Sequence, residues 1–213
     1  MKKQGYSTGY IGKWHLTGHR RNPVDATNRR GWDFWAVRNC SHAHSKPEYW
    51  LNDAEDPVRV PGWEPDVQTD LAVEFIKKNR EAPFCLFLSF GPPHNPYKAP
   101  GKYVEMYEGK ELKERPNVPD GRPSSLKQYY AMTTSLDSCM GRISAALSEA
   151  GISEDTILVF SSDHGDMLGS QGHKLKQRPW EESINIPFIL RYPRRVQKGQ
   201  RRDWIVSSVD VMP

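Results

Sequence analysis

The sequence has no long apolar run, no paired cysteine motif and no internal repeat, and each absence excludes a class of protein. No stretch of about 18 apolar residues is present, so no membrane-spanning helix is predicted. The three cysteines, Cys40, Cys85 and Cys139, form no CxxC pair and have no zinc-finger spacing. Cys85 lies in an apolar run and Cys139 in a helical pattern, so we expect both to be buried packing residues.

A strong excess of one charge is also absent. The chain has 30 basic and 26 acidic side chains, which leaves a formal net charge of +4. No basic stripe interleaved with aromatic residues is present, which argues against nucleic-acid binding. A mild positive charge suits the attraction of an anionic substrate instead. With 37% hydrophobic residues, 7 Trp and 9 Tyr in 213 residues, the composition is typical of a globular protein with a sizeable core.

Three apolar runs predict strands, at residues 83–90, 156–161 and 186–192. The first two are apolar almost throughout, which is typical of strands covered on both faces in a parallel sheet. Helical patterns lie between the runs, so helices and strands alternate along the chain. This alternation predicts an α/β fold with a mostly parallel central sheet, in which ligands bind beyond the carboxyl ends of the strands.

Two helices are predicted from their periodicity. The first extends from an N-cap at Asp66 to about Asn79, with apolar residues along one stripe. The second begins after Ser124 or Ser125 and ends at Gly151, which is well placed to terminate it. These boundaries follow from the polar caps and from the glycine, which favours a left-handed backbone.

Two segments, 21–65 and 97–123, are predicted to be mainly loops. The first contains His42 and His44, two residues apart. No third metal ligand lies nearby in the sequence, which argues against a zinc site. The abundance of aromatic residues around the two histidines indicates, weakly, a pocket that binds a carbohydrate or aryl substrate.

The segment Gly12–Leu16 carries the first chemical motif, with Lys13 and His15 two residues apart. On a strand, side chains at this spacing share a face, so both could approach one anionic group. Chance alternation on a surface strand is the other interpretation.

A second motif, Ser162–Asp166, directly follows the predicted strand at 156–161. Carboxylates at the end of a strand commonly hold a divalent cation beside a negatively charged substrate, which makes Asp163 and His164 candidate metal ligands. Aspartates in this position can also simply stabilise a turn.

The third candidate is His94, in a proline-rich loop after the strand at 83–90. The prolines hold this histidine in a fixed pose, as needed for a proton donor or a contact to an oxyanion. A rigid strand exit with an exposed histidine is the other reading. Lys174 and Lys176 precede the last strand, and taken alone either is an ordinary solvated charge.

Taken in order, these motifs resemble those of the type I sulfatases of the alkaline phosphatase superfamily. The matching segments are Gly5–Leu16, Pro93–Pro96, Ser162–Gly169, and Lys176 followed by Trp180–Ser183. The resemblance covers essentially the whole chain. It implies a three-layer α/β sandwich with a mostly parallel central sheet, similar to alkaline phosphatase and incomplete in this chain.

The resemblance also implies roles for individual residues. Lys13 would contact the catalytic aldehyde hydrate and the sulfate, and His15 would act on the hydrate as sulfate is released. His94 and Lys176 would bind sulfate and help the leaving oxygen depart, with Lys176 favoured over Lys174 by its spacing to Trp180. Asp163 and His164 would supply part of a Ca²⁺ site, for metal binding.

One departure from the family pattern concerns the nucleophile. Sulfatases use a formylglycine made from the cysteine or serine of a C-x-P-S-R-like motif, and none of the three cysteines has that context. We therefore expect residues 1–213 to be an internal part of the catalytic domain, without the first strand that carries the nucleophile and without the C-terminal domain. Alone, this fragment is expected to be inactive and to bind Ca²⁺ weakly.

The resemblance predicts a hydrolase, specifically a sulfuric ester hydrolase that removes sulfate from a sulfated carbohydrate or aryl ester. The alternatives are a phosphonate monoester or phosphodiester hydrolase of the same superfamily, and a non-catalytic relative that binds sulfate or glycan. The expected partners are a sulfated small molecule or glycan and a formylglycine-generating or sulfatase-maturating enzyme. Family members are mostly periplasmic, lysosomal or secreted.

Overall fold

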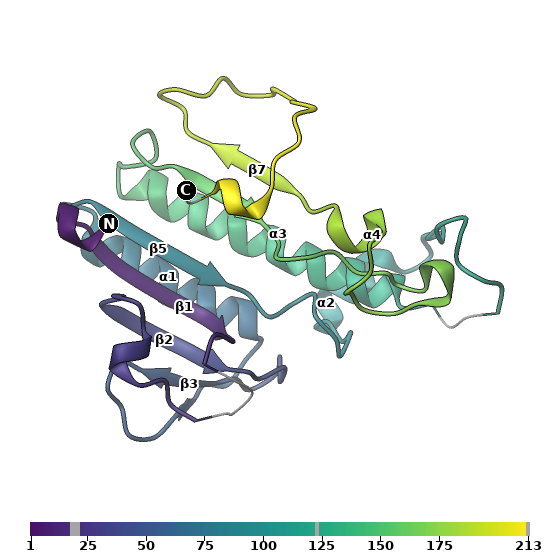
Figure 1. The fold of residues 1–213 in the computed structure, drawn as a ribbon, viewed down its shortest axis with the longest axis horizontal. Helices are drawn as coiled ribbons and strands as arrows, with labels where there is room; N and C mark the ends of the chain where they lie inside the picture. Colours follow the sequence, from purple (N-terminus) through teal and green to yellow (C-terminus); the bar gives the residue numbers. More distant parts are fainter. Residues whose placement is uncertain (18–21, 122–123, 212–213) are drawn as a thin grey trace. The chain divides into compact units, whose positions relative to one another are not determined.

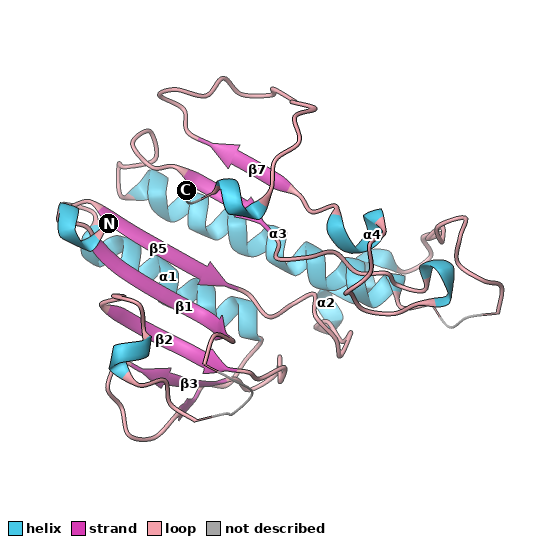
Figure 2. Cartoon of the chain, in the orientation of Figure 1, coloured by secondary structure: helices cyan, strands magenta, loops and turns pink. Residues whose placement is uncertain are grey.

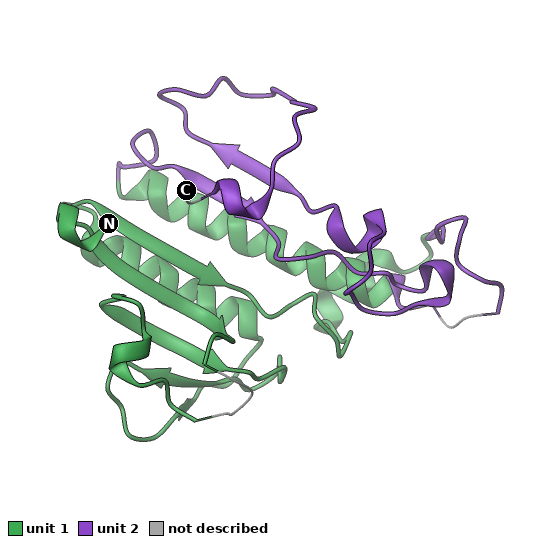
Figure 3. Cartoon of the chain, viewed as in Figure 1, with its two compact units in different colours: residues 1–110, 127–150 green, residues 111–126, 151–213 purple. Residues whose placement is uncertain are grey.

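The computed structural model describes residues 1–17, 22–121 and 124–211, which form two compact units (Figure 1, Figure 3). Unit 1 consists of Met1–Lys110 and Lys127–Ala150, and unit 2 consists of Glu111–Leu126 and Gly151–Pro213. Each unit has its own β-structure, so each is considered by itself.

Unit 1 is built on a five-stranded sheet with the strand order β4-β3-β2-β1-β5. Its strands are β1 (Ser7–Trp14), β2 (Phe34–Asn39), β3 (Glu48–Leu51), β4 (Val58–Arg59) and β5 (Phe84–Ser89). The central strand β1 is parallel to both β2 and β5, whereas β3 and β4 add antiparallel strands at one side. The predicted α/β class with a mostly parallel central sheet is confirmed, and so is the strand predicted at 83–90.

The segment 21–65 is loop-rich, as predicted, but it also contains the strands β2, β3 and β4, which were not predicted. The run from Phe34 to Val37 is apolar enough to predict a strand, and its aromatic content obscured that signal. The second loop-rich segment fits the prediction better over the part that the structure describes. Between residues 97 and 121 it contains only the one-turn helix α2 (Gly101–Val104) and a short 3-10 turn, Glu105–Tyr107.

Helix α1 (Glu64–Asn79) packs on one face of the sheet (Figure 2). The Phe75 ring lies so close to β1 that a Cβ atom at Gly9 would be 2.7 Å from it. The helix begins two residues before the predicted N-cap, Asp66, which therefore lies in the first turn. Pro65 is well suited to the first turn, because the missing N–H has no partner there, and this shifts the start to Glu64.

Helix α3 (Leu126–Glu149) matches the second predicted helix. The Ser124 hydroxyl accepts a hydrogen bond from the Leu126 backbone N–H at 3.2 Å, and Gly151 has a left-handed φ of +72° just beyond the helix. Within unit 1, α3 packs against α1, where the Trp63 indole N–H donates to the Ser135 hydroxyl at 3.2 Å.

The opposite face of the sheet carries an aromatic layer. Tyr10 and Trp14 of β1 pack with Trp35 of β2, with ring centroids 4.9 to 5.6 Å apart. The Phe87 ring of β5 stacks on Tyr10, although half of the Phe87 side chain is exposed. The expectation that the strand at 83–90 is fully covered on both faces is therefore wrong for this residue. Cys139 is buried as expected, whereas Cys85 is only half-buried.

Unit 2 contains an antiparallel pair of strands, β6 (Leu158–Ser161) and β7 (Phe188–Arg191), and the short helix α4 (Glu181–Ile184) in the segment between them. The predicted strands at 156–161 and 186–192 are both present. However, β6 pairs antiparallel with β7 and has no other strand partner among the described residues, so its prediction as a doubly covered strand in a parallel sheet is wrong. Its apolar side chains are partly exposed, as Val159 illustrates, and so is Ile157 just before the strand.

Among the described helices, none has both the length and the apolar character needed to cross a membrane.

Candidate functional site

Three parallel strands of unit 1 end at one edge of the sheet. The register pairs Gly12 of β1 with Ser89 of β5, and Trp14 of β1 with Asn39 of β2. Residues that follow these pairs leave the sheet on the same side, where α/β proteins commonly bind ligands. This carboxyl edge of unit 1 therefore receives the predicted site residues Lys13, His15, His42 and His94.

Gly12 fixes the backbone that leads into Lys13. Its φ is +111°, and a Cβ atom there would lie 2.0 Å from the Ser89 carbonyl oxygen. Only glycine permits this close approach of β1 to β5. One residue later, the Lys13 carbonyl oxygen accepts a hydrogen bond from the Tyr10 hydroxyl at 2.7 Å. The backbone at Gly12 and Lys13 is thus held by close contact with β5 and by the Tyr10 hydroxyl.

β1 ends at Trp14, so Lys13 lies on the strand and His15 lies just beyond it. The side-chain alternation of a strand therefore does not extend to His15. The His15 ring Nε2 lies 3.3 Å from the Cys40 sulfur, which follows the last residue of β2. This contact joins the ends of two neighbouring strands. No spacing in the sequence predicts that the thiol of Cys40 lies near a candidate catalytic histidine.

His94 is held by its own loop and by a second histidine. The ring Nδ1 of His94 lies 2.7 Å from the Asn95 carbonyl oxygen, so this nitrogen carries a hydrogen and donates it. The His42 ring lies parallel to the His94 ring with centroids 4.0 Å apart. The proton that His94 could exchange with a substrate is consequently assigned to the other ring nitrogen, Nε2.

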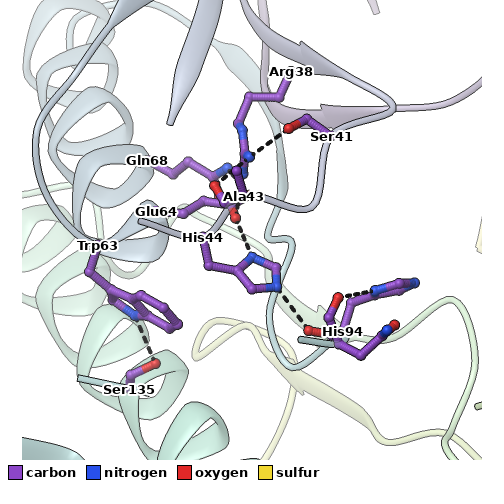
Figure 4. Close-up of polar contacts among 10 residues, drawn as sticks. Arg38, Ser41, Ala43, His44, Trp63, Glu64, Gln68, His94 and Ser135 are labelled. Atoms are coloured by element: carbon purple, nitrogen blue, oxygen red, sulfur yellow. Dashed lines mark hydrogen bonds and ion pairs between the residues drawn. The ribbon is translucent and has the colours of Figure 1, made fainter. Parts of the chain in front are cut away.

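Behind His94 lies a buried polar cluster formed by Arg38, His44 and Glu64 (Figure 4). The Glu64 carboxylate forms an ion pair with Arg38 and a hydrogen bond with His44, whose Nδ1 is 2.7 Å away. The Nε2 of His44 lies 2.8 Å from the His94 carbonyl oxygen. Both ring nitrogens of His44 have hydrogen-bond partners within the protein, and the residue is only 4% exposed. His44 is therefore poorly placed to contact a substrate directly.

Opposing effects act on the Glu64 carboxyl. Burial raises its pKa, but the hydrogen bond with His44 and the charge of Arg38 outweigh this, and the pKa is lowered overall. Gly91 leaves room for the carboxylate, because a Cβ atom there would be 2.6 Å from Glu64 Oε1. Sequence reasoning missed Glu64 and Arg38, since a single acidic residue in a first helical turn ordinarily indicates only a favourable helix dipole.

In unit 2, a cavity of about 590 Å³ brings together the other predicted residues, Asp163, His164 and Lys176. Lys174 is not among the residues that line it. The remaining lining residues are Gln177, Arg178, Pro179, Ser183, Ile184, Ile186, Val206, Ser207 and Ser208.

The turn at 163–166 is shaped by close backbone packing. The Ser162 hydroxyl donates to the His164 carbonyl oxygen at 2.7 Å, and His164 Nδ1 donates to the Gly165 carbonyl oxygen at 2.7 Å. A Cβ atom at Gly165 would be 2.2 Å from the Glu182 carbonyl oxygen, so glycine allows this turn to pack beside α4.

The donor set of unit 2 fits only part of a calcium site. The Asp163 side chain is 82% exposed, and His164 Nε2 lies 3.5 Å from its Oδ2. Ca²⁺ prefers six to eight oxygen ligands, whereas this pair offers one carboxylate and one imidazole. Across residues 1–17, 22–121 and 124–211, no group of three or more His, Cys, Asp or Glu side chains is arranged to hold a metal ion.

Comparison with known proteins identifies the family. The sulfatase family model matches residues 1–213. The chain belongs to the sulfatase family. The resemblance of its motifs to type I sulfatases of the alkaline phosphatase superfamily is thereby confirmed. Sulfatases use formylglycine and Ca²⁺.

Two curated sulfatases and one solved structure illustrate the similarity. The ulvan-active sulfatase of Formosa agariphila is 37% identical and aligns with 100% of this chain and 44% of its own length. The endo-4-O-sulfatase of Bacteroides thetaiotaomicron is 30% identical over 100% of this chain and 48% of its own. The crystal structure of yidJ from Bacteroides fragilis, classed as a sulfatase, has a TM-score of 0.84 at 33% identity, covering 92% of this chain and 49% of that one. The chain spans about half the length of the curated relatives it matches.

Proposed function

We propose that this chain is part of a sulfuric ester hydrolase that removes sulfate from a sulfated carbohydrate. The observation that carries the proposal is the sulfatase match over all of residues 1–213, which includes every predicted site residue. The relatives named as ulvan-active and endo-4-O-sulfatases favour a sulfated glycan over an aryl ester. In this proposal, residues 1–213 belong to the catalytic domain.

Lys13 and His94 of unit 1 would bind the sulfate oxygens and offset the charge that develops in the transition state. Lys176 of unit 2 is proposed to have the same role because of its place in the family motif. The Nδ1 of His94 is engaged with the Asn95 carbonyl, so Nε2 would be the atom that gives a proton to the leaving sugar oxygen. His15 would take part in the later release of sulfate. His42 would hold His94 by ring stacking rather than bind substrate directly.

Formylglycine would supply the nucleophile for this reaction, after modification by a formylglycine-generating or sulfatase-maturating enzyme. Asp163 would provide one carboxylate ligand for Ca²⁺, and His164 would lie next to it. The described donors are too few for a complete calcium site, so the proposed roles of this chain's residues concern binding and proton transfer only.

The test is release of sulfate from sulfated oligosaccharides by the full-length gene product, co-expressed with a maturation enzyme. We expect sulfate esters to be hydrolysed faster than phosphonate monoesters. Confirmed formylglycine together with no turnover of any sulfate ester would overturn the proposal. Faster hydrolysis of the phosphonate would favour the alternative activity within the superfamily.

Two lysines provide a matched pair of variants. Lys176→Ala is expected to lower kcat by about 100-fold or more, in the range found when one stabilising donor is removed from an active site. Lys174→Ala, which removes an equal charge two residues away, should retain activity near that of the parent protein. Equal losses in both variants would contradict the assignment of Lys176.

A further inference from the structure

We propose that His44 is a positioning residue that holds the catalytic loop at His94 and that it does so as a doubly protonated imidazolium. The proposal rests on the proposed function for the role of His94, but the geometry of His44 is independent of that function. Figure 4 draws the contacts that carry it, which run from Arg38 and Glu64 through His44 to the His94 carbonyl.

The protonation state follows from the two partners of the ring. Nδ1 of His44 lies 2.7 Å from a Glu64 oxygen, and Glu64 is an ionised acceptor. Nε2 lies 2.8 Å from the His94 carbonyl oxygen, which can only accept. Both ring nitrogens must therefore donate, and a histidine that donates from both nitrogens carries a positive charge.

The cluster leaves one positive charge uncompensated. Arg38 and His44 are cationic and Glu64 is the anion between them, and all three are almost fully buried. A buried charge interacts strongly because water does not screen it well. A net positive charge directly behind the His94 backbone would favour an anion such as sulfate at this edge of the sheet, in addition to fixing the loop.

His44 restrains the backbone of the loop through its contact with the His94 carbonyl oxygen. His44 donates to this oxygen, while the His94 ring donates to the next carbonyl, that of Asn95. One hydrogen bond fixes the backbone and the other fixes the ring. Loss of the first would let the loop shift and carry the ring with it, because outer partners of catalytic groups control their orientation.

Two substitutions separate the two contacts of His44. An asparagine amide nitrogen lies as many bonds from Cα as Nδ1 does, so His44→Asn keeps the donor to Glu64 and loses the donor to His94. A glutamine amide nitrogen lies as many bonds from Cα as Nε2 does, so His44→Gln keeps the donor to His94. In both variants, Glu64 retains its ion pair with Arg38.

The first measurement uses ¹⁵N NMR of the His94 ring in the 213-residue chain. We expect His44→Asn to shift and broaden the His94 ring signals, and His44→Gln to leave them near those of the parent chain. Unchanged signals in His44→Asn, or equal changes in both variants, would overturn the proposal. If His44→Asn does not fold, the His44 ring in the parent chain decides, since protons on both nitrogens at neutral pH are required.

The second measurement is sulfate release by the full-length gene product. His44→Asn should lower kcat by about tenfold or more with a smaller change in KM, and His44→Gln should recover most of it. Absence of turnover in the parent protein would count against the proposed function and leave the NMR comparison to decide the role of His44. Active parent protein with equal kcat in His44→Asn would overturn the positioning role alone.

Discussion

The His42 ring lies parallel to the His94 ring, with an angle of 9° between the planes and 4.0 Å between the centroids. His42 follows β2 and His94 follows β5, so this contact joins two loops that leave the sheet on either side of β1. Because two like charges this close repel each other, the stack is most stable when at most one ring is charged.

Removal of the His42 ring is expected to loosen His94. Aromatic pairs contribute about 0.5–1.5 kcal/mol, so His42→Ala should reduce kcat about two- to twelvefold. His42→Phe keeps a flat ring that cannot be charged and should retain most of the activity. Steady-state kinetics of the full-length gene product provide the check, and an equal loss in both variants would rule out stacking as the cause.

Gly12→Ala is expected to destabilise unit 1 strongly. The added Cβ would meet the Ser89 carbonyl oxygen at 2.0 Å, and the φ of +111° is unfavourable for alanine, so we expect a loss of about 3 kcal/mol. Urea unfolding measures this change. Gly141→Ala is the control, because Gly141 lies inside α3 with no atom within 4 Å of the added Cβ, and there alanine should stabilise by about 1 kcal/mol.

Stability should fall in acid because of Glu64. Its folded-state pKa is lowered from the ordinary value of 4.5, so its contribution is fully present above pH 4.5 and is lost as the pH falls through the folded-state pKa. Glu64→Gln should lower stability at neutral pH and flatten the pH dependence below 4.5. Thermal unfolding between pH 3 and 7, with about one-unit steps, tests this, and an unchanged acid slope in the variant would contradict it.

Arg115 should restrain the loop that follows the motif at Asp163. Its guanidinium donates to the Asp166 and Met167 carbonyl oxygens at 3.2 and 3.1 Å and to the Ser170 hydroxyl at 3.3 Å. All three hydrogen bonds come from one guanidinium nitrogen, Nη1, and Arg115→Met removes this donor. The amides of residues 166–171 should then exchange hydrogen faster, because the free energy of local opening falls by about 1 kcal/mol. Arg201→Met, at a highly exposed site, is the control.

The sequence allowed the strands at 83–90, 156–161 and 186–192 to be predicted because apolar runs of that length have few other uses. The antiparallel pairing of β6 with β7 was not predicted. Apolar residues indicate that a strand is present, but they do not determine whether the neighbouring strand is parallel or antiparallel. The start of α1 was misplaced because Asp66 resembles a cap, and the influence of Pro65 one residue earlier was overlooked.

Some residues of the candidate site could be predicted from the sequence, and others could not. Lys13, His94 and Asp163 stand in motifs with local order, so short stretches of sequence suffice to select them. Glu64 and Arg38 become important only through contacts with residues far away in the chain, and no spacing rule connects them. His44 was selected as a pocket residue for its chemistry, whereas its burial depends on the packing of α1 against the loop after β2.

The hydrogen bond from Tyr10 to the Lys13 carbonyl connects the aromatic layer to the backbone of Lys13. Tyr10 is packed among Trp14, Trp35 and Phe87, so a change of volume among those rings moves its hydroxyl and, through it, the peptide that carries the Lys13 ammonium. Natural variation in tryptophan-rich packing could therefore retune affinity for an anion without altering any group that touches it. Searches for the origin of different preferences among related enzymes should include this aromatic face of the sheet.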